Sequence, residues 1–178
     1  MKYLIAVVAT VALSGFAMAE QPYAGLQNRS IKALSEQQIA DLTAGRGMGL
    51  ALAAELNGYP GPIHAVELAE QIQLTPDQVS KLKALFEAMK AETIPLGTSL
   101  VSQERDLNDD FAKHTITLAR LEAVTQQIGT TQAALRAAHL KYHLSTVEIL
   151  TPAQIARYNE LRGYKAHDPT AHGNHQSR

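Results

Sequence analysis

Five histidines in the C-terminal part of the sequence are the side chains best suited to bind a metal ion. His139 and His143 are four residues apart, so on a helix they share one face and can approach one ion. His167, His172 and His175 follow in a polar tail. Neutral imidazole binds zinc, nickel or copper near pH 7. Two histidines do not complete a zinc site, so the alternatives are packing or solvated histidines and a tail with no specific role.

No catalytic set of residues accompanies these histidines in the sequence. Cysteine is absent, which excludes thiol chemistry, thiolate ligands and disulfides. Residues 106–110 begin like a calcium loop, but Phe111 and Thr117 stand where Gly and Glu are required. Residues 45–49 are rich in glycine but follow no strand, so they do not form a dinucleotide-binding loop. We therefore expect a protein that is not an enzyme and requires no cofactor.

The N-terminal residues predict an export signal. Lys2 is followed by a largely apolar stretch at residues 3–16, and residues 17–19 have the small-x-small form of a cleavage site. We expect cleavage before Glu20, with an uncleaved anchor as the alternative. The 16 basic and 17 acidic residues nearly balance. Nothing in this composition favours nucleic-acid binding, which calls for a basic patch.

Three copies of one short segment mark expected helix starts. Each has Leu, then Ser or Thr, two variable positions, Gln and a β-branched residue, at residues 34–39, 74–79 and 150–155. The hydroxyl can cap the helix while Gln reaches back to the cap amide, and Pro at the first helical position suits the two later copies. The capping residues of those two copies are Leu74, Thr75, Gln78, Leu150, Thr151 and Gln154.

Two long helices are expected between the two later copies. The first starts at Thr75, and its apolar residues are spaced alternately by four and three, which places them on one face. Pro95 lies inside it, where we expect a kink. Residues 108–117 predict a turn, and a second helix over residues 118–149 returns antiparallel with its own apolar face. The residues of the first stripe, which serve either the fold or client binding, are Leu82, Phe86, Met89, Leu96 and Leu100.

The remaining segments are expected to flank this hairpin. Residues 20–62 form an arm with a helix from about 36 to 57, softened by the glycines at 45–49. A short helix at about 65–73 and a last helix at 152–162 complete the hairpin domain, residues 63–164, before a disordered tail. The fold class is therefore all-α, an elongated hairpin with short flanking helices. Such a thin hairpin exposes an apolar stripe unless a second copy or a client covers it.

Taken together, these features resemble the LTxxQ-motif periplasmic proteins, which include the Spy and CpxP stress chaperones, the zinc-linked ZraP proteins and the CnrX-type metal sensors. The resemblance covers about residues 68–164 and is carried by residues 74–78, 135–140 and 150–154. It implies a curved homodimer in the periplasm that holds unfolded or misfolded proteins without ATP.

The resemblance also leaves an alternative, a heavy-metal sensor or zinc-linked resistance protein with a sensor kinase or other envelope regulator as its partner. The family's metal sensors use histidine and acidic ligands from the helical core. His139 and His143 fall in the corresponding helix, but only His64 is available near the start of the domain. Similar histidine-rich tails occur beside the zinc-associated members, which keeps this alternative open.

Overall fold

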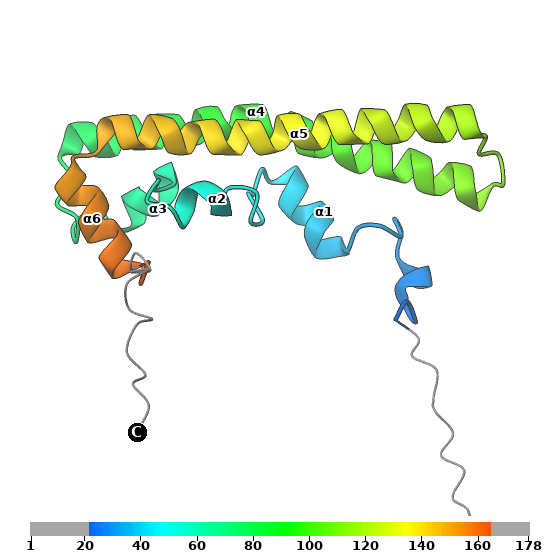
Figure 1. The fold of residues 1–178 in the computed structure, drawn as a ribbon, viewed down its shortest axis with the longest axis horizontal. Coiled ribbons are helices and arrows are strands. Elements are labelled where there is room, and N and C mark those ends of the chain that lie inside the picture. The colour runs from blue at the N-terminus through cyan, green and yellow to red at the C-terminus, as the bar shows by residue number, and fades with distance from the viewer. Residues whose placement is uncertain (1–21, 165–178) are drawn as a thin grey trace, which may run out of the picture.

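The computed structural model describes residues 22–164, which form an all-helical fold. Two long helices lie antiparallel along the length of the molecule, and the N-terminal segment runs along one side of them (Figure 1). The elements in chain order are the 3₁₀ helix η1 (Leu26–Asn28), α1 (Glu36–Thr43), α2 (Leu52–Glu55), α3 (Pro62–Glu67), α4 (Pro76–Ala112), α5 (Leu118–Ile149) and α6 (Pro152–Leu161). Within residues 22–164, no helix is both long and apolar enough to cross a membrane. The expected export signal and the histidine-rich tail lie outside the described residues.

All three copies of the repeated segment begin helices, as predicted. The side chains of Ser35, Thr75 and Thr151 each accept from the backbone N–H three residues on, and the Gln at that position accepts from the cap N–H. At Thr75 these two distances are 3.2 Å and 2.9 Å. Each pair satisfies backbone groups that a helix start leaves without partners. Local chemistry therefore decides where α1, α4 and α6 begin.

The two motif glutamines also bond to each other across the base of the hairpin. Gln78 donates from Nε2 to Oε1 of Gln154 at 2.9 Å, and Gln154 donates from Nε2 to Oε1 of Gln78 at 3.0 Å. The same amides reach the backbone carbonyls of Ile149 and Gln73. The glutamines therefore join the starts of α4 and α6, in addition to capping them.

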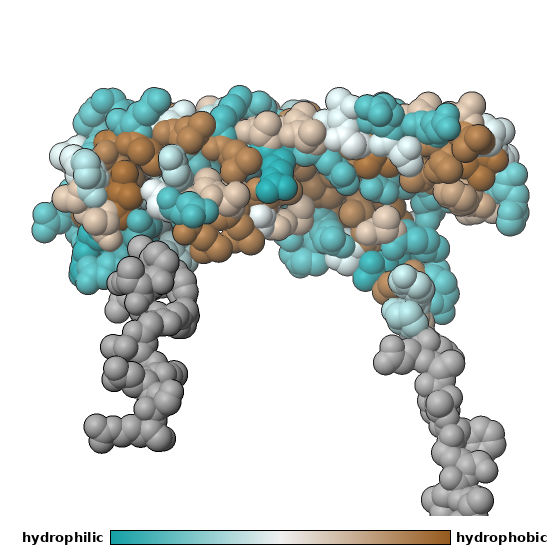
Figure 2. Space-filling model, viewed as in Figure 1, coloured by the Kyte–Doolittle hydropathy of each residue, from teal (hydrophilic) through white to brown (hydrophobic). Residues whose placement is uncertain are grey.

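The hairpin of two long helices is confirmed, with the second helix at its predicted bounds and the first longer than predicted. α4 continues through Pro95 and extends to Ala112, further into the expected turn than the polar residues suggested, and α5 spans Leu118–Ile149. In the predicted stripe Leu82, Met89 and Leu100 are buried, whereas Phe86 and Leu96 are half-buried. Apolar side chains remain exposed at the hairpin turn, where Phe111 is 51% and Leu118 is 72% accessible (Figure 2).

The prediction of one helix over residues 36–57 is wrong. α1 ends at Thr43, and α2 is a single turn at Leu52–Glu55. Between them Gly45, Met48 and Gly49 have φ values of 68°, 43° and 86°, in the left-handed region that a right-handed helix cannot contain. The short helix expected at 65–73 is also displaced, because α3 spans Pro62–Glu67 and turns follow it.

The N-terminal segment packs against the hairpin. Ile31 and Leu42 are buried in the same apolar cluster as Leu100, Val124 and Leu135 of the two long helices. A second cluster gathers around the fully buried Tyr158 of α6. Part of the apolar face for which we expected a second copy or a client is therefore covered by the chain itself.

Candidate functional site

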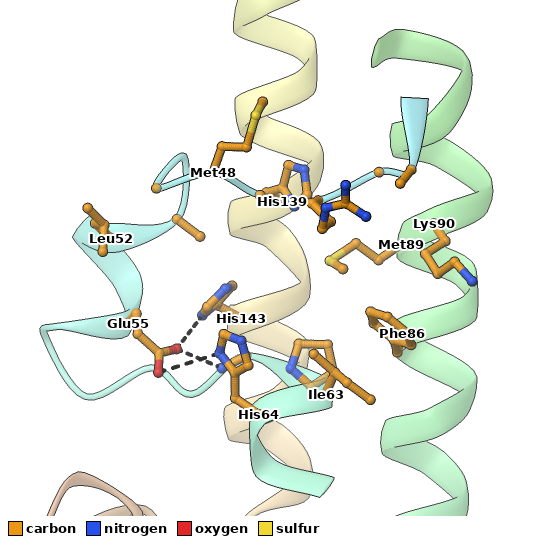
Figure 3. Close-up of a pocket in the computed structure, with 18 of the residues that line it drawn as sticks. Met48, Leu52, Glu55, Ile63, His64, Phe86, Met89, Lys90, His139 and His143 are labelled. Carbon is orange, nitrogen blue, oxygen red and sulfur yellow. Dashed lines mark hydrogen bonds and ion pairs between the residues drawn. The ribbon is translucent and has the colours of Figure 1, made fainter. Parts of the chain in front are cut away.

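An open cleft of about 820 Å³ lies where the N-terminal segment meets the hairpin (Figure 3). One wall comes from the loop between α1 and α2 and from α3, and the other comes from α4 and α5. Its volume is in the range of ligand-binding pockets, which are typically about 300–1,000 Å³. Apolar side chains from both walls dominate the lining, and they are Met48, Leu52, Ile63, Phe86, Met89 and Ile94.

The apolar lining continues to the surface at the rim of the cleft. Met48 is 43% and Leu52 is 53% exposed, although both are large apolar residues. Two cations also line the cleft: Arg46, whose Nε lies 2.5 Å from Asp41, and Lys90, whose Nζ lies 5.5 Å from the centre of the Phe86 ring. Lys90 is also paired with Glu87, so both cations have acidic partners and the cleft mainly offers apolar contact.

A buried carboxylate organises the polar end of the cleft. Glu55 is 6% exposed, and it accepts hydrogen bonds from the Tyr158 hydroxyl and from the Gly61 N–H. The imidazoles of His64 and His143 each lie 3.7 Å from one of its oxygens (Figure 3). Burial by itself raises the pKa of Glu55, but the contacts with His64, Tyr158 and Gly61 outweigh it and hold the pKa below its ordinary value. Glu55 is therefore an anion at neutral pH.

The two α5 histidines have different surroundings. His143 Nδ1 lies 2.7 Å from the carbonyl oxygen of Tyr59, and because a carbonyl only accepts, this nitrogen carries the proton. His139 is 2% exposed, and its Nε2 is buried with no hydrogen-bond partner among residues 22–164. Burial, and to a lesser extent the nearby His143, lower the pKa of His139. His139 is therefore neutral at pH 7.

Comparison with known proteins places this hairpin in a family. Residues 63–162, more than half of the chain, match the model described as LTXXQ motif family protein. The chain belongs to the LTXXQ motif family. No curated protein and no solved structure matches it. Members of this family are generally not enzymes.

In this LTXXQ protein one wall of the cleft lies within the matched residues, and most of the other wall precedes them. The hairpin wall and His64 belong to residues 63–162, whereas Arg46, Met48, Leu52 and Glu55 precede them. The capping residues predicted as motif positions lie at the base of the hairpin and do not line the cleft. In this chain the site therefore depends on residues that the family pattern does not include.

The predicted site residues of this LTXXQ protein are only partly brought together. His139 and His143 line the cleft with His64, and Phe86 and Met89 of the predicted stripe line it too. Leu82, Leu96 and Leu100 pack instead in the two apolar clusters. Among the described residues, no three His, Asp or Glu side chains are grouped so that they could hold a metal ion. Metal binding at His139 and His143 stays a prediction, and His167, His172 and His175 lie outside the described residues.

Sequence reasoning missed several residues of the site. The sequence places Met48, Leu52 and Glu55 in one helix softened at residues 45–49, and it suggests no role for Tyr158. One signal was available, because Glu55 is the only charged residue between Arg46 and His64. A lone carboxylate in an apolar stretch is often buried against a partner, but its partner Tyr158 is 103 positions away in the chain.

We expect His139 to make this LTXXQ protein less stable as the pH falls from about 7 to 5.5. The unfolded chain binds a proton near its ordinary pKa of about 6.5, whereas burial lowers the pKa in the folded state. The unfolded state therefore binds more protons in this interval, so acidification favours unfolding, by at most about 1.4 kcal/mol per pH unit. Urea unfolding of His139→Leu should show a flatter dependence on pH. His114→Asn, at the exposed hairpin turn, is the control and should keep the wild-type slope.

Proposed function

We propose that this protein is a periplasmic, ATP-independent chaperone or envelope-stress protein of the Spy and CpxP type. It holds unfolded or misfolded periplasmic proteins by apolar contact and releases them unchanged. Binding an unfolded client shifts its folding and aggregation equilibria by mass action, so no fuel is required. A homodimer, and a sensor kinase or other envelope regulator as a partner, are further proposals that follow from the resemblance.

The observation that carries this proposal is the open apolar cleft with its exposed rim. Met48 and Leu52 present apolar surface to solvent at the mouth, and Phe86 and Met89 continue it inward. Methionine side chains are unbranched and flexible, which suits a surface that binds many different apolar segments. Arg46 and Lys90 also line the cleft, but each is paired with a carboxylate, of Asp41 and Glu87, so apolar contact is the main attraction for a client.

A light-scattering assay with a chemically denatured client in metal-free buffer tests the proposal. Equimolar wild-type protein should suppress aggregation of the client. Met48→Ser combined with Leu52→Ser should weaken the suppression about fivefold or more, because each exposed apolar contact contributes on the order of 1 kcal/mol to binding. Leu118→Ser, which changes an exposed leucine at the distant hairpin turn, is the matched control. Unchanged aggregation with the wild-type protein would reject the chaperone function.

The same assay, repeated with zinc, separates the second candidate function. His139 and His143 line one cleft with His64, and although these side chains are not grouped as a complete metal site among the described residues, their proximity is the observation behind a metal-responsive protein. If the protein is a chaperone that needs no metal, added zinc should not change how well the wild-type protein or His139→Leu suppresses client aggregation. Suppression that requires zinc and is lost in His139→Leu would favour the metal-responsive function instead.

A further inference from the structure

Residues 31–45 cover an apolar face of the hairpin that belongs to the family region, although these residues do not. Ile31 is completely buried and Leu42 is 4% exposed, and both pack in the cluster that contains Leu100, Val101 and Leu135. The match to the LTXXQ family begins only at residue 63. In Figure 1 this segment lies along the hairpin between η1 and α2. The hairpin therefore has a face that already holds a short helical segment.

The backbone of α4 comes unusually close to this segment. A methyl group at Gly97 would lie 2.1 Å from the carbonyl oxygen of Leu42, which is too close for any side chain. A methyl group at Gly45 would lie 2.7 Å from Oγ1 of Thr93. Gly97 therefore forms a notch in α4 into which the end of α1 fits.

Apolar contact, rather than specific polar bonds, holds the segment in place. Among the described residues, one hydrogen bond involving a side chain joins residues 31–45 to the hairpin, from the Lys32 backbone N–H to Oδ1 of Asn108 at 3.3 Å. No ion pair joins the two parts within the described residues. Contacts of this kind recognise shape and aliphatic character, which many other short helices share.

We propose that the face around Gly97 is a docking site for a short amphipathic helix of a partly folded client, and that residues 31–45 occupy it in cis until such a helix replaces them. The occupant shows the required chemistry, a capped helix of two turns with Ile39 and Leu42 on its inner side. Beyond it, Gly45, Met48 and Gly49 have positive φ values, so the chain leaves the face through non-helical backbone that can act as a hinge. The client as partner rests on the proposed function.

A fluorescent peptide with the sequence of residues 30–45 is the probe for this face. Wild-type protein should not bind about 10 µM peptide, because a tethered segment competes at an effective concentration on the order of millimolar. Ile31→Ala combined with Leu42→Ala weakens the tethered segment and leaves the face intact, so its affinity for the peptide should be at least tenfold higher. Fluorescence anisotropy measures both.

Two glycine variants separate release of the segment from blocking of the face. Gly97→Ala should expose residues 31–45 to protease and yet bind no peptide, because the added methyl group fills the notch for either occupant. Gly129→Ala is the matched control, since it makes the same change inside α5 where nothing lies within 4 Å. It should behave like the wild-type protein in both measurements.

An engineered disulfide that holds residues 31–45 on the hairpin, called the lock, tests the proposal even if the double alanine variant fails to fold. The chain has no cysteine, and a Cβ at residue 45 would lie 2.7 Å from Oγ1 of Thr93, so Gly45→Cys combined with Thr93→Cys places two cysteine side chains next to each other for oxidation to a disulfide. The oxidised form should suppress client aggregation less than the reduced form. The reduced form carries the same strain at residue 45, where φ is 68°, so it is the internal control.

Three outcomes would overturn the docking site. These are equal peptide binding by the wild-type and double alanine proteins, suppression of client aggregation by the reduced disulfide variant that oxidation does not lower, or a double alanine variant that binds no peptide and doubles in mass, which would assign the face to a second copy. If the peptide results hold but no variant suppresses aggregation, the docking site stands and the chaperone function fails. The two proposals are therefore distinguishable.

Discussion

Replacing Tyr158 by Ala is expected to lower the free energy of unfolding by about 3–5 kcal/mol, a large part of the stability of a domain of this size. Tyr158 is completely buried and packs with Ala65, Ile72 and Leu82. Its hydroxyl also donates to the buried carboxylate of Glu55. The substitution therefore leaves a cavity and removes a donor from a buried charge at the same time. Urea denaturation followed by circular dichroism measures the effect.

Tyr158→Phe separates the two contributions. It keeps the ring and removes only the hydroxyl, so it should cost about 1–3 kcal/mol, the penalty for leaving a buried acceptor without its partner. In Glu55→Gln the carboxylate charge is absent, and the added loss from Tyr158→Phe should be smaller there. Tyr23→Ala is the control, because Tyr23 is 77% exposed and should change stability little. An equal loss from Tyr158→Phe in both backgrounds would show that the hydroxyl and Glu55 are not coupled.

The parts of this fold that follow local rules could be predicted from the sequence. A hydroxyl cap with Gln three residues on marks the starts of α1, α4 and α6, and the alternating spacing of apolar residues predicts α5 and all but the last turn of α4. These rules act within a few residues, so one sequence is enough to apply them. The family assignment, which depends on the same positions, is confirmed for the same reason.

The candidate site could not be predicted, because it depends on contacts between distant parts of the chain. The helix expected over residues 36–57 breaks where Gly45, Met48 and Gly49 adopt positive φ, and for Met48 that conformation has no clear sequence signal. The break turns α2 back so that Glu55 reaches His143 and Tyr158. Sequence periodicity placed the two α5 histidines on one face, but it could not show that the N-terminal segment buries them.

The cleft and the segment of residues 31–45 are connected through the loop between α1 and α2. The loop between α1 and α2 lines the cleft through Arg46 and Met48, and α1 fills the notch at Gly97 immediately before it. Movement of residues 31–45 away from the hairpin would therefore open the cleft and uncover the docking face together. The proposed client surface then grows from a cleft to a continuous apolar face, without any change in the hairpin itself.

The motif glutamines are expected to stabilise the fold by more than their capping role, and Gln78→Ala should lower the free energy of unfolding by about 1–3 kcal/mol. Gln78 accepts from the Thr75 N–H, exchanges two hydrogen bonds with Gln154 and donates to the Ile149 carbonyl. Its removal takes one hydrogen-bond partner from each polar atom of the Gln154 amide, which keeps its bonds to Thr151 and Gln73, and removes the side-chain donor to the Ile149 carbonyl. Chemical denaturation monitored by circular dichroism measures the loss.

Gln38 provides the matched control for this prediction. It completes the same capping box at Ser35, where its Oε1 accepts from the cap N–H at 2.8 Å, but it makes no bond across the fold among the described residues. Gln38→Ala should therefore cost only the capping contribution, about 0.5–1 kcal/mol. Gln78→Ala with Gln154→Ala should cost less than the sum of the single changes, because the second substitution finds its partner already gone. Equal losses from Gln38→Ala and Gln78→Ala would reduce the motif to three independent helix caps, whereas the expected difference would show that Gln78 and Gln154 also join the starts of α4 and α6 at the base of the hairpin.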